Sequence, residues 1–389
     1  MEEAMTRYER IEAAWSLKEA DRVPSDPLNC YILPYQGGIS IREMFTDPKK
    51  LIEATIRGRE IVGEGDQVDP NITTLDHFSP LPKSGWDQVT LHWKIQDDFP
   101  PNGNIPSFYE KCIVEDYDDM MERGFSTLLF NKGAQELYNK KIDEFLYYAF
   151  EYPKIYAQAW REYVEKYQVP LLMGGRGCTP LDLLQYYRGM PNLARDLFER
   201  PEKVKEVCEW LLDYEVTIAM RQAEVMGAGE VLGAEKVFWI NGGPPGMSPK
   251  IFEEFFWPTA KKGIDIIVKR GFKVDCHWDG DLTPHLDILK DITKGLPKGK
   301  VMLDLEKTDM AKAKEVLGDK VCLYGNTPSS LLVYGTPRDV EKYCKQLIED
   351  CAEGGGFILS TECETPWNAK PENVRAIIDT AIKYGQYRR

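Results

Sequence analysis

The segment KVMLDLEKTDMAKAKEVLGDKVCLYGN, residues 300–326, contains one complete strand–helix–strand unit. Short apolar runs of β type occupy its two ends, at 300–306 and 320–326, and an amphipathic helical stretch lies between them. Such alternation predicts a parallel sheet, because each helix carries the chain back to the same edge before the next strand begins.

The same unit recurs along most of the chain. Further apolar runs lie at 169–178, 229–240, 272–278 and 356–363, and two earlier candidate strands lie at 23–28 and 67–74. Together with the two runs quoted above they make eight, which predicts an α/β fold closed into a (β/α)8 TIM barrel. The alternative is an open doubly wound sheet. However, no G-x-G-x-x-G sequence opens a helix after a strand, and the GGPPG run at 242–246 is too rich in proline to hold a pyrophosphate.

Helices are predicted between these strands and before them. Four stretches carry proline in the first turn, as helices often do, at 201–226, 249–270, 337–353 and 371–385. An earlier helical pattern at 6–20 precedes the first strand, so we expect an N-terminal extension ahead of the barrel.

No composition shift or flexible linker divides the chain, so we expect one domain over residues 1–389. Residues 76–137 do not follow the repeat and include a PPNGN turn at 100–104. We interpret them as a long insertion near the catalytic face that serves as a lid or partner surface. Ordinary packing at the edge of the barrel is the alternative.

The composition excludes several classes of protein. The 49 Lys and Arg residues against 63 Asp and Glu residues leave a net charge of −14, which argues against a nucleic-acid binder. No apolar run approaches the ~18 residues that span a bilayer, and the N-terminus carries charges where a signal peptide is apolar, so we expect a soluble cytoplasmic protein. The nine cysteines form no C-x-x-C pair, so neither a disulfide framework nor a zinc ribbon is indicated.

Polar side chains gather where the predicted strands end, which is where a parallel barrel places its active site. His277 and Asp279 are two residues apart in an extended segment, so both leave the same face and can share one ion. Asp304 and Glu306 repeat this spacing one strand later, and Cys363 ends the last strand. Imidazole, carboxylate and thiolate together favour Zn²⁺ over Mg²⁺ or Ca²⁺.

Ordinary structural roles are the alternative for each of these residues. A histidine near a strand end is often a hydrogen-bonded core residue, and a free cysteine such as Cys363 is often only a small buried hydrophobe. Asp304 and Glu306 could pair with Lys307 and Lys312 at the rim. Cys276 should point away from His277 and serve packing.

The strand-end residues lie in segments that resemble the uroporphyrinogen decarboxylase superfamily. The resemblance is carried by residues 248–287, 301–328 and 355–378, with the DLEKTDMAKAKEVLGDKVCLYGN stretch as the most specific piece, and by the early DRVPSDP and DPKKLIEAT segments. It covers most of the chain and implies a single barrel. The superfamily contains decarboxylases and corrinoid-dependent methyltransferases, and the fold alone does not distinguish them.

Two motifs favour the methyltransferase branch. The decarboxylases bind their polycarboxylate substrate with an R-Q-x-G-R motif, whereas residues 33–38 here read LPYQGG. The zinc methyltransferases use H-x-C on one strand and a second cysteine on the last. His277 and Cys363 match the outer positions, but Asp279 replaces the middle cysteine. The resemblance therefore implies zinc held by His277, Cys363 and a carboxylate, for which we choose Glu306, with Asp279 as the other candidate.

The carboxylate has a chemical consequence. A carboxylate in place of a thiolate leaves more positive charge on zinc, which suits an oxygen ligand such as an aryl methyl ether. The resemblance thus implies the methyltransferase I component of an O-demethylase, which moves a methyl group from a methoxylated aromatic to the cob(I)alamin of a separate corrinoid protein. The remaining site residues expected from this reading are Glu235, Asp279 and Asn326 as catalytic residues and Tyr35, Trp278 and Tyr324 as substrate-binding aromatics.

Other readings stay open. A methylcorrinoid:thiol or methylcorrinoid:tetrahydrofolate methyltransferase would use the same barrel, a decarboxylase would rely on arginines rather than on a metal, and a non-enzymatic binding subunit is the remaining class. The string DCHWDG at 275–280 also satisfies D-x-H-x-x-G, in which the histidine of a corrinoid-binding protein ligates cobalt, but here it lies inside the barrel repeat. We therefore expect cobalamin to arrive on a partner. A homodimer is possible.

Overall fold

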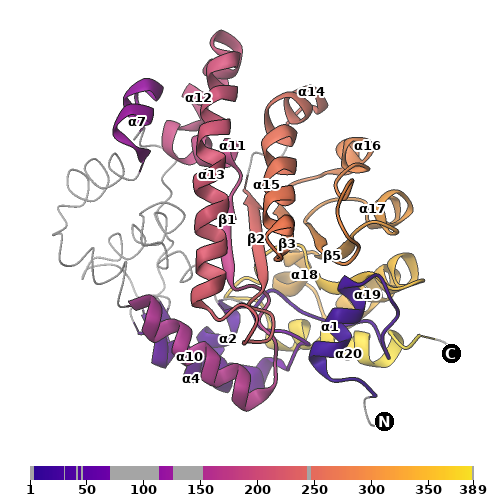
Figure 1. Cartoon of the computed structure of the whole chain (residues 1–389). Coiled ribbons are helices and arrows are strands. Elements are labelled where there is room, and N and C mark those ends of the chain that lie inside the picture. Colours follow the sequence, from indigo (N-terminus) through magenta and orange to yellow (C-terminus); the bar gives the residue numbers. More distant parts are fainter. Residues whose placement is uncertain are drawn as a thin grey trace.

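The computed structural model describes residues 4–29, 31–40, 43–44, 47–70, 114–125, 152–242 and 247–387 (Figure 1). The predicted insertion at 76–137 lies outside these residues except for 114–125. That piece contains helix α7 (Tyr117–Arg123), which contacts α13 (Pro201–Val225). The hydroxyl of Tyr117 donates to Asp196 of α12 (Met190–Glu199) at 2.8 Å. None of the described helices is long and apolar enough to cross a membrane.

Six parallel strands form one sheet in the order of the sequence. They are β1 (Gly175–Cys178), β2 (Lys236–Asn241), β3 (Lys273–Trp278), β4 (Val301–Leu305), β5 (Cys322–Thr327) and β6 (Phe357–Thr361). Four lie within the runs predicted from the sequence, and β2 and β5 each extend one residue beyond theirs. Because all six strands are parallel, their carboxyl ends meet at one end of the sheet.

Two further segments close the sheet into a barrel. Ser25 forms a parallel bridge with Leu359 of β6, and Val68 forms one with Leu171, just ahead of β1. The two segments are joined to each other, since the amide of Asp66 donates to the carbonyl of Ser25 at 2.7 Å. The eight-position α/β barrel is therefore confirmed.

The two closing segments are single bridges rather than the full strands predicted at 23–28 and 67–74. Prolines flank both bridges, at 24, 27 and 70, and a proline has no amide hydrogen to donate to a ladder. Residues 71–74 lie outside the described part of the chain.

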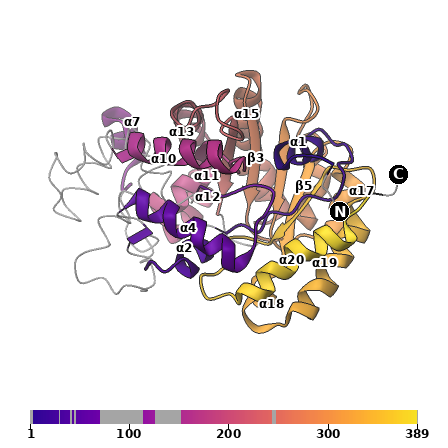
Figure 2. The same ribbon diagram turned by 90° about the horizontal axis from the view of Figure 1, so that it is seen from below.

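Helices surround the sheet, as Figures 1 and 2 show. Those of the N-terminal half are α1 (Arg7–Trp15), α2 (Ile32–Gln36), α4 (Pro48–Val62), α10 (Tyr152–Tyr167), α11 (Pro180–Arg188), α12 (Met190–Glu199) and α13 (Pro201–Val225). Those of the C-terminal half are α14 (Pro249–Ile251), α15 (Trp257–Lys269), α16 (Leu286–Leu289), α17 (Met310–Leu317), α18 (Ser329–Tyr334), α19 (Pro337–Cys351) and α20 (Pro371–Tyr384). The stretch predicted as one helix over 249–270 is interrupted by a π-helical turn at Phe252–Phe256.

The N-terminal extension covers the amino end of the barrel. The ring of Trp15, the last residue of α1, lies 5.9 Å from the amino group of Lys236 and 5.6 Å from that of Lys273, which are the first residues of β2 and β3. The extension therefore leaves the carboxyl ends of the strands free for a site.

The pleat of the strands separates two layers of side chains. On β3, Val274, Cys276 and Trp278 pack outward with residues of the surrounding helices, while Asp275 and His277 face the barrel interior with Phe238 and Tyr324. Cys276 points away from His277, as expected.

Candidate functional site

His277 is the inward-facing residue at the carboxyl end of β3 and is only 7% exposed. Its Nδ1 lies 2.5 Å from Oδ2 of Asp304, the residue beside it on β4. The ring of Phe238 from β2 stacks on the imidazole, with 4.9 Å between the ring centroids. One ring nitrogen is thus occupied, and Nε2 faces the residues that follow the carboxyl ends of β3 and β6.

Asp279 and Cys363 meet His277 at this nitrogen. Asp279 follows β3, and its amide donates to the carbonyl of Asn241 at 3.0 Å. Cys363 follows β6, and its carbonyl accepts the hydroxyl of Thr361 at 2.7 Å. Nε2 of His277 is 3.2 Å from Oδ1 of Asp279 and 3.7 Å from Sγ of Cys363, and Sγ lies 4.0 Å from Oδ1.

These three atoms fit a metal ion. All lie within 4.8 Å of one another. For metal–ligand bonds of ~2.0 Å to nitrogen or oxygen and ~2.3 Å to sulfur, the edges of a tetrahedral site are roughly 3.3–3.5 Å long. The three separations scatter around that length, so small side-chain adjustments would bring all three donors onto one ion. Three protein ligands also leave a fourth position for substrate, as catalytic zinc sites do.

The electrostatics of the cluster agree with a cation-binding role. Burial alone would lower the pKa of His277, but Asp304, Asp279 and Cys363 together raise it well above its ordinary value. Burial raises the pKa of the Cys363 thiol to about 11, against the opposing effect of His277. The two groups hold protons that a metal would displace on binding, so metal affinity should rise with pH.

Glu306, the carboxylate chosen from the sequence as the third metal ligand, is not in this cluster. Its Oε2 accepts a hydrogen bond from the amide of Gly280, and its other oxygen lies 3.2 Å from the amino group of Lys307. Asp279, the other candidate, takes the position beside His277. Glu306 instead supports the turn that carries Asp279.

The other two expected catalytic residues are not brought to the cluster. Glu235 precedes β2 and therefore lies at the amino end of the barrel, 3.5 Å from Lys273, so its expected place at a strand end is wrong. Asn326 is buried on β5, where its amide donates to the carbonyl of Thr308 at 2.9 Å and accepts from Tyr343. Asn326 ties β5 to the loop after β4.

Two of the three aromatics expected to bind substrate belong to the core. Trp278 is 1% exposed and packs edge-on against Phe256, with ring centroids 5.0 Å apart, because its strand position points outward. Tyr324 is fully buried in the barrel, where its hydroxyl donates to Asp26 at 2.8 Å. Tyr35 is partly exposed and packs against Trp367, and it stays a candidate.

Two neighbours of the cluster were not among the site residues chosen from the sequence. Asp304 is 1% exposed and bound to His277 instead of lying at the rim. Glu364, next to Cys363, is close enough for His277 and Arg176 to offset part of the rise in its pKa caused by burial. The contact of Asp304 with His277 could have been predicted from the sequence. The two residues stand near the ends of consecutive parallel strands, which lie side by side in the sheet.

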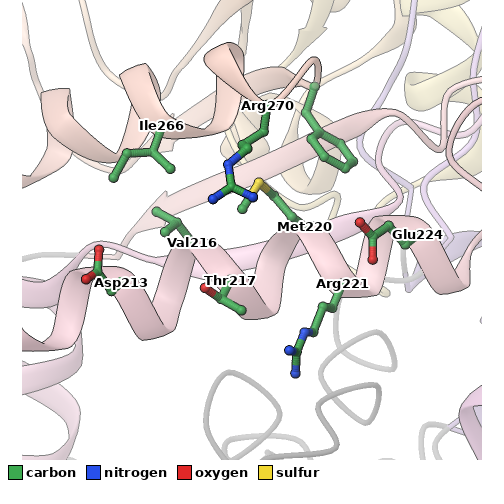
Figure 3. Close-up of a pocket in the computed structure, with 9 residues that line it drawn as sticks. Asp213, Val216, Thr217, Met220, Arg221, Glu224, Ile266 and Arg270 are labelled. Atoms are coloured by element: carbon green, nitrogen blue, oxygen red, sulfur yellow. The ribbon is translucent and has the colours of Figure 1, made fainter.

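Two cavities differ in their relation to the cluster. One of about 470 Å³ lies at the carboxyl ends of β4, β5 and β6 and is lined by Glu306, Asn326 and Glu362 among others. Another, of about 530 Å³, lies outside the barrel between α13 and α15, where Figure 3 shows Val216 and Met220 facing Ile266 and Arg270. The first shares the end of the barrel with the cluster, whereas the second contains none of the predicted site residues.

Comparisons with known proteins agree with this architecture. The family model described as uroporphyrinogen decarboxylase (URO-D) matches residues 140–384. The uroporphyrinogen decarboxylase of Pseudoalteromonas atlantica (strain T6c / ATCC BAA-1087) is 32% identical over 228 residues, which make up 56% of this chain and 59% of that protein. A solved structure described as a methyltransferase from Methanosarcina mazei aligns over 98% of this chain and 99% of its own, with a TM-score of 0.60 and 16% identity. At that identity, the structural likeness shows the fold alone.

Proposed function

Because this chain belongs to the uroporphyrinogen decarboxylase family, we propose that it is a zinc-dependent methyltransferase of that family. The methyl group would move from a methoxylated aromatic compound to cob(I)alamin on a separate corrinoid protein. The observation that carries the proposal is the meeting of His277, Asp279 and Cys363 at the open end of the barrel. The similar fold of a protein described as a methyltransferase supports the proposal of a methyltransferase.

The donor set suits this reaction. When bound here, the metal supplies Lewis-acid polarisation of a substrate oxygen. His277, Asp279 and Cys363 would hold it, and the carboxylate of Asp279 makes the site harder than one with two thiolates. An aryl methyl ether gives up its methyl group slowly because phenolate is a poor leaving group, so a site that favours an oxygen ligand addresses the difficult step.

The surrounding residues shape the place where this happens. Glu306 holds the amide of Gly280 and thereby the turn that presents Asp279. The cavity at the ends of β4 to β6 offers space for substrate at the same end of the barrel, where Glu362, the neighbour of Cys363, lines it. The partly exposed pair of Tyr35 and Trp367, with ring centroids 4.9 Å apart, is our candidate for contact with a flat ring. The corrinoid protein as partner, and a homodimer, remain predictions.

A decarboxylase is the second candidate, because a relative that bears this name is 32% identical over the matched part. It would act without a metal and would need arginines to bind a polycarboxylate. The LPYQGG segment at 33–38 has no arginine where that motif is expected. A methyltransferase with a thiol or tetrahydrofolate acceptor would use the same barrel. The thiol enzyme favours a second thiolate where this chain has Asp279, and the tetrahydrofolate enzyme needs no zinc.

The proposal is tested by metal analysis and by methyl transfer. The purified protein should contain close to one zinc per chain. With a supplied corrinoid protein, it should form methylcobalamin from veratrole or vanillate. His277→Ala should lose the metal and the transfer while retaining the helical circular dichroism spectrum. His285→Ala is the matched control, because His285 is also buried and stacked on an aromatic ring but lies outside the cluster.

The outcomes separate the candidates. Zinc with methyl transfer from an ether supports the proposal, and zinc with transfer only to a thiol supports the thiol enzyme. A metal-free protein that releases carbon dioxide from a tetrapyrrole carboxylate would be a decarboxylase. Full activity in His277→Ala would refute the ligand assignment.

A further inference from the structure

The contact between His277 and Asp304 follows directly from the sheet. The two residues are paired in the parallel register of β3 and β4, and both face the barrel interior. Nδ1 of the imidazole and Oδ2 of the carboxylate are 2.5 Å apart, a short separation typical of a charge-assisted hydrogen bond. Since the strands set this pairing, the contact does not depend on a flexible loop.

The contact determines which ring nitrogen is free. A carboxylate can only accept at Nδ1, so Nδ1 keeps its proton, and Nε2 is the nitrogen that gives up a proton to present a lone pair to a metal. Nε2 is the atom that faces Asp279 and Cys363, at 3.2 and 3.7 Å. The stacked ring of Phe238, inclined by 26°, restricts rotation of the imidazole plane. The imidazole is therefore held both in its tautomer and in its orientation.

Asp304 is a buried carboxylate whose hydrogen bonding is incomplete among the described residues. It is 1% exposed, and its Oδ1 has no hydrogen-bond partner within the described residues. A buried carboxylate with an unsatisfied oxygen is costly, so its presence at this position calls for an explanation. Its one hydrogen bond in the described part of the chain goes to the histidine of the cluster.

We propose that Asp304 is a positioning residue of the metal centre. It does not contact the ion, and it acts through His277 by fixing the Nδ1–H tautomer and aiming Nε2 at the position shared with Asp279 and Cys363. This inference rests on the cluster being a metal site, and hence on the proposed function, but its effect on the imidazole exists in the metal-free protein as well.

Two variants test it. Asp304→Leu removes the acceptor at similar size, and Asp304→Asn keeps an oxygen that can still accept from Nδ1. Zinc affinity, measured by competition with a chromophoric chelator, should fall by roughly 10–100-fold in the leucine variant, the usual cost of losing such a partner, and less in the asparagine variant. Asp196→Asn is the control, because Asp196 is also a buried carboxylate but lies on α12 and binds Arg188 and Arg200, so the zinc affinity of the folded variant should stay within about 2-fold of wild type.

The second readout uses no metal. In metal-free protein with ¹⁵N-labelled histidine, at a pH high enough for the ring of His277 to be neutral, its ring-nitrogen signals, assigned with His277→Ala, should show protonated Nδ1 in wild type and in Asp304→Asn. They should shift toward exchange between tautomers in Asp304→Leu. A purely structural role would lower stability without moving these signals. If the leucine variant does not fold, Asp304→Ala, which also removes the acceptor, takes its place in both readouts.

The results distinguish the two claims. Wild type that binds no zinc, yet shows the Nδ1–H tautomer lost in Asp304→Leu, would overturn the metal function and leave the positioning of the ring intact. If wild type binds zinc but Asp304→Leu has the same zinc affinity, the positioning role alone is overturned. Unchanged ring signals in Asp304→Leu would overturn it as well.

Discussion

Replacing Asp26 by asparagine should make the protein's stability less dependent on pH. Asp26 is 1% exposed inside the barrel, where its Oδ2 accepts hydrogen bonds from Tyr324 at 2.8 Å and from Gln67 at 2.7 Å. Gln67 in turn accepts from the buried amino group of Lys236 at 3.1 Å. Burial raises the pKa of Asp26 to about 8, and the two hydrogen bonds offset only part of that effect.

The sign and size of the effect follow from proton linkage. The folded chain keeps the proton on Asp26 up to about pH 8, whereas the unfolded chain loses it near pH 4. The stabilisation from this group is therefore complete below about pH 4 and is lost as the pH rises toward 8, by about 1.4 kcal/mol per pH unit. Between pH 5 and 7 the loss is about 3 kcal/mol. Asp26→Asn cannot titrate, so its free energy of unfolding should gain that much relative to wild type over the same interval.

Urea denaturation of both proteins at pH 5, 6 and 7 measures this difference. Asp196→Asn serves as the control: Asp196 is buried as well, but Arg188 and Arg200 outweigh its burial and lower its pKa. That variant should be destabilised by an amount that stays constant between pH 5 and 7. If the free-energy difference between Asp26→Asn and wild type is also constant over that interval, the assignment of a protonated Asp26 is incorrect.

Three further predictions address the corrected site residues. Trp278→Ala should lower the free energy of unfolding by about 3–5 kcal/mol, because it empties a buried aromatic site. Zinc binding of the folded fraction should be unchanged. If Trp278 instead contacts substrate, the variant will show a raised KM at unchanged stability. Glu235→Gln should lower the free energy of unfolding by less than about 1 kcal/mol and leave the zinc content as in wild type, since it removes only the partly exposed ion pair with Lys273. Loss of zinc in this variant would show that Glu235 takes part in metal binding. Asp279→Cys should bind zinc more tightly in chelator competition but transfer methyl groups from aryl ethers more slowly, because a second thiolate lowers the charge on the metal; faster ether cleavage in this variant would contradict the proposed role of the carboxylate.

Much of the site could be predicted because its signals are local. His277 and Cys363 each end an apolar run, and the carboxyl ends of parallel strands meet whatever the details of packing. Their side chains indeed approach to 3.7 Å. Glu235 was misplaced for a related reason: the apolar run at 229–240 does not reveal that its strand begins only at Lys236, which puts Glu235 at the opposite end of the barrel.

The amino-acid sequence by itself determined the repeat of strands and helices, the proline starts of the helices and the pairing of a histidine with a distant cysteine, since periodicity and strand order are carried by neighbouring residues. Only the tertiary structure decided that Asp279 rather than Glu306 joins them, that Asp304 lies behind the imidazole, and that Trp278 is core. Those outcomes depend on the register between strands and on which face of the pleat each side chain leaves. A shift of one residue in either would have exchanged the inner and outer sets, so the sequence pattern alone could not choose between them.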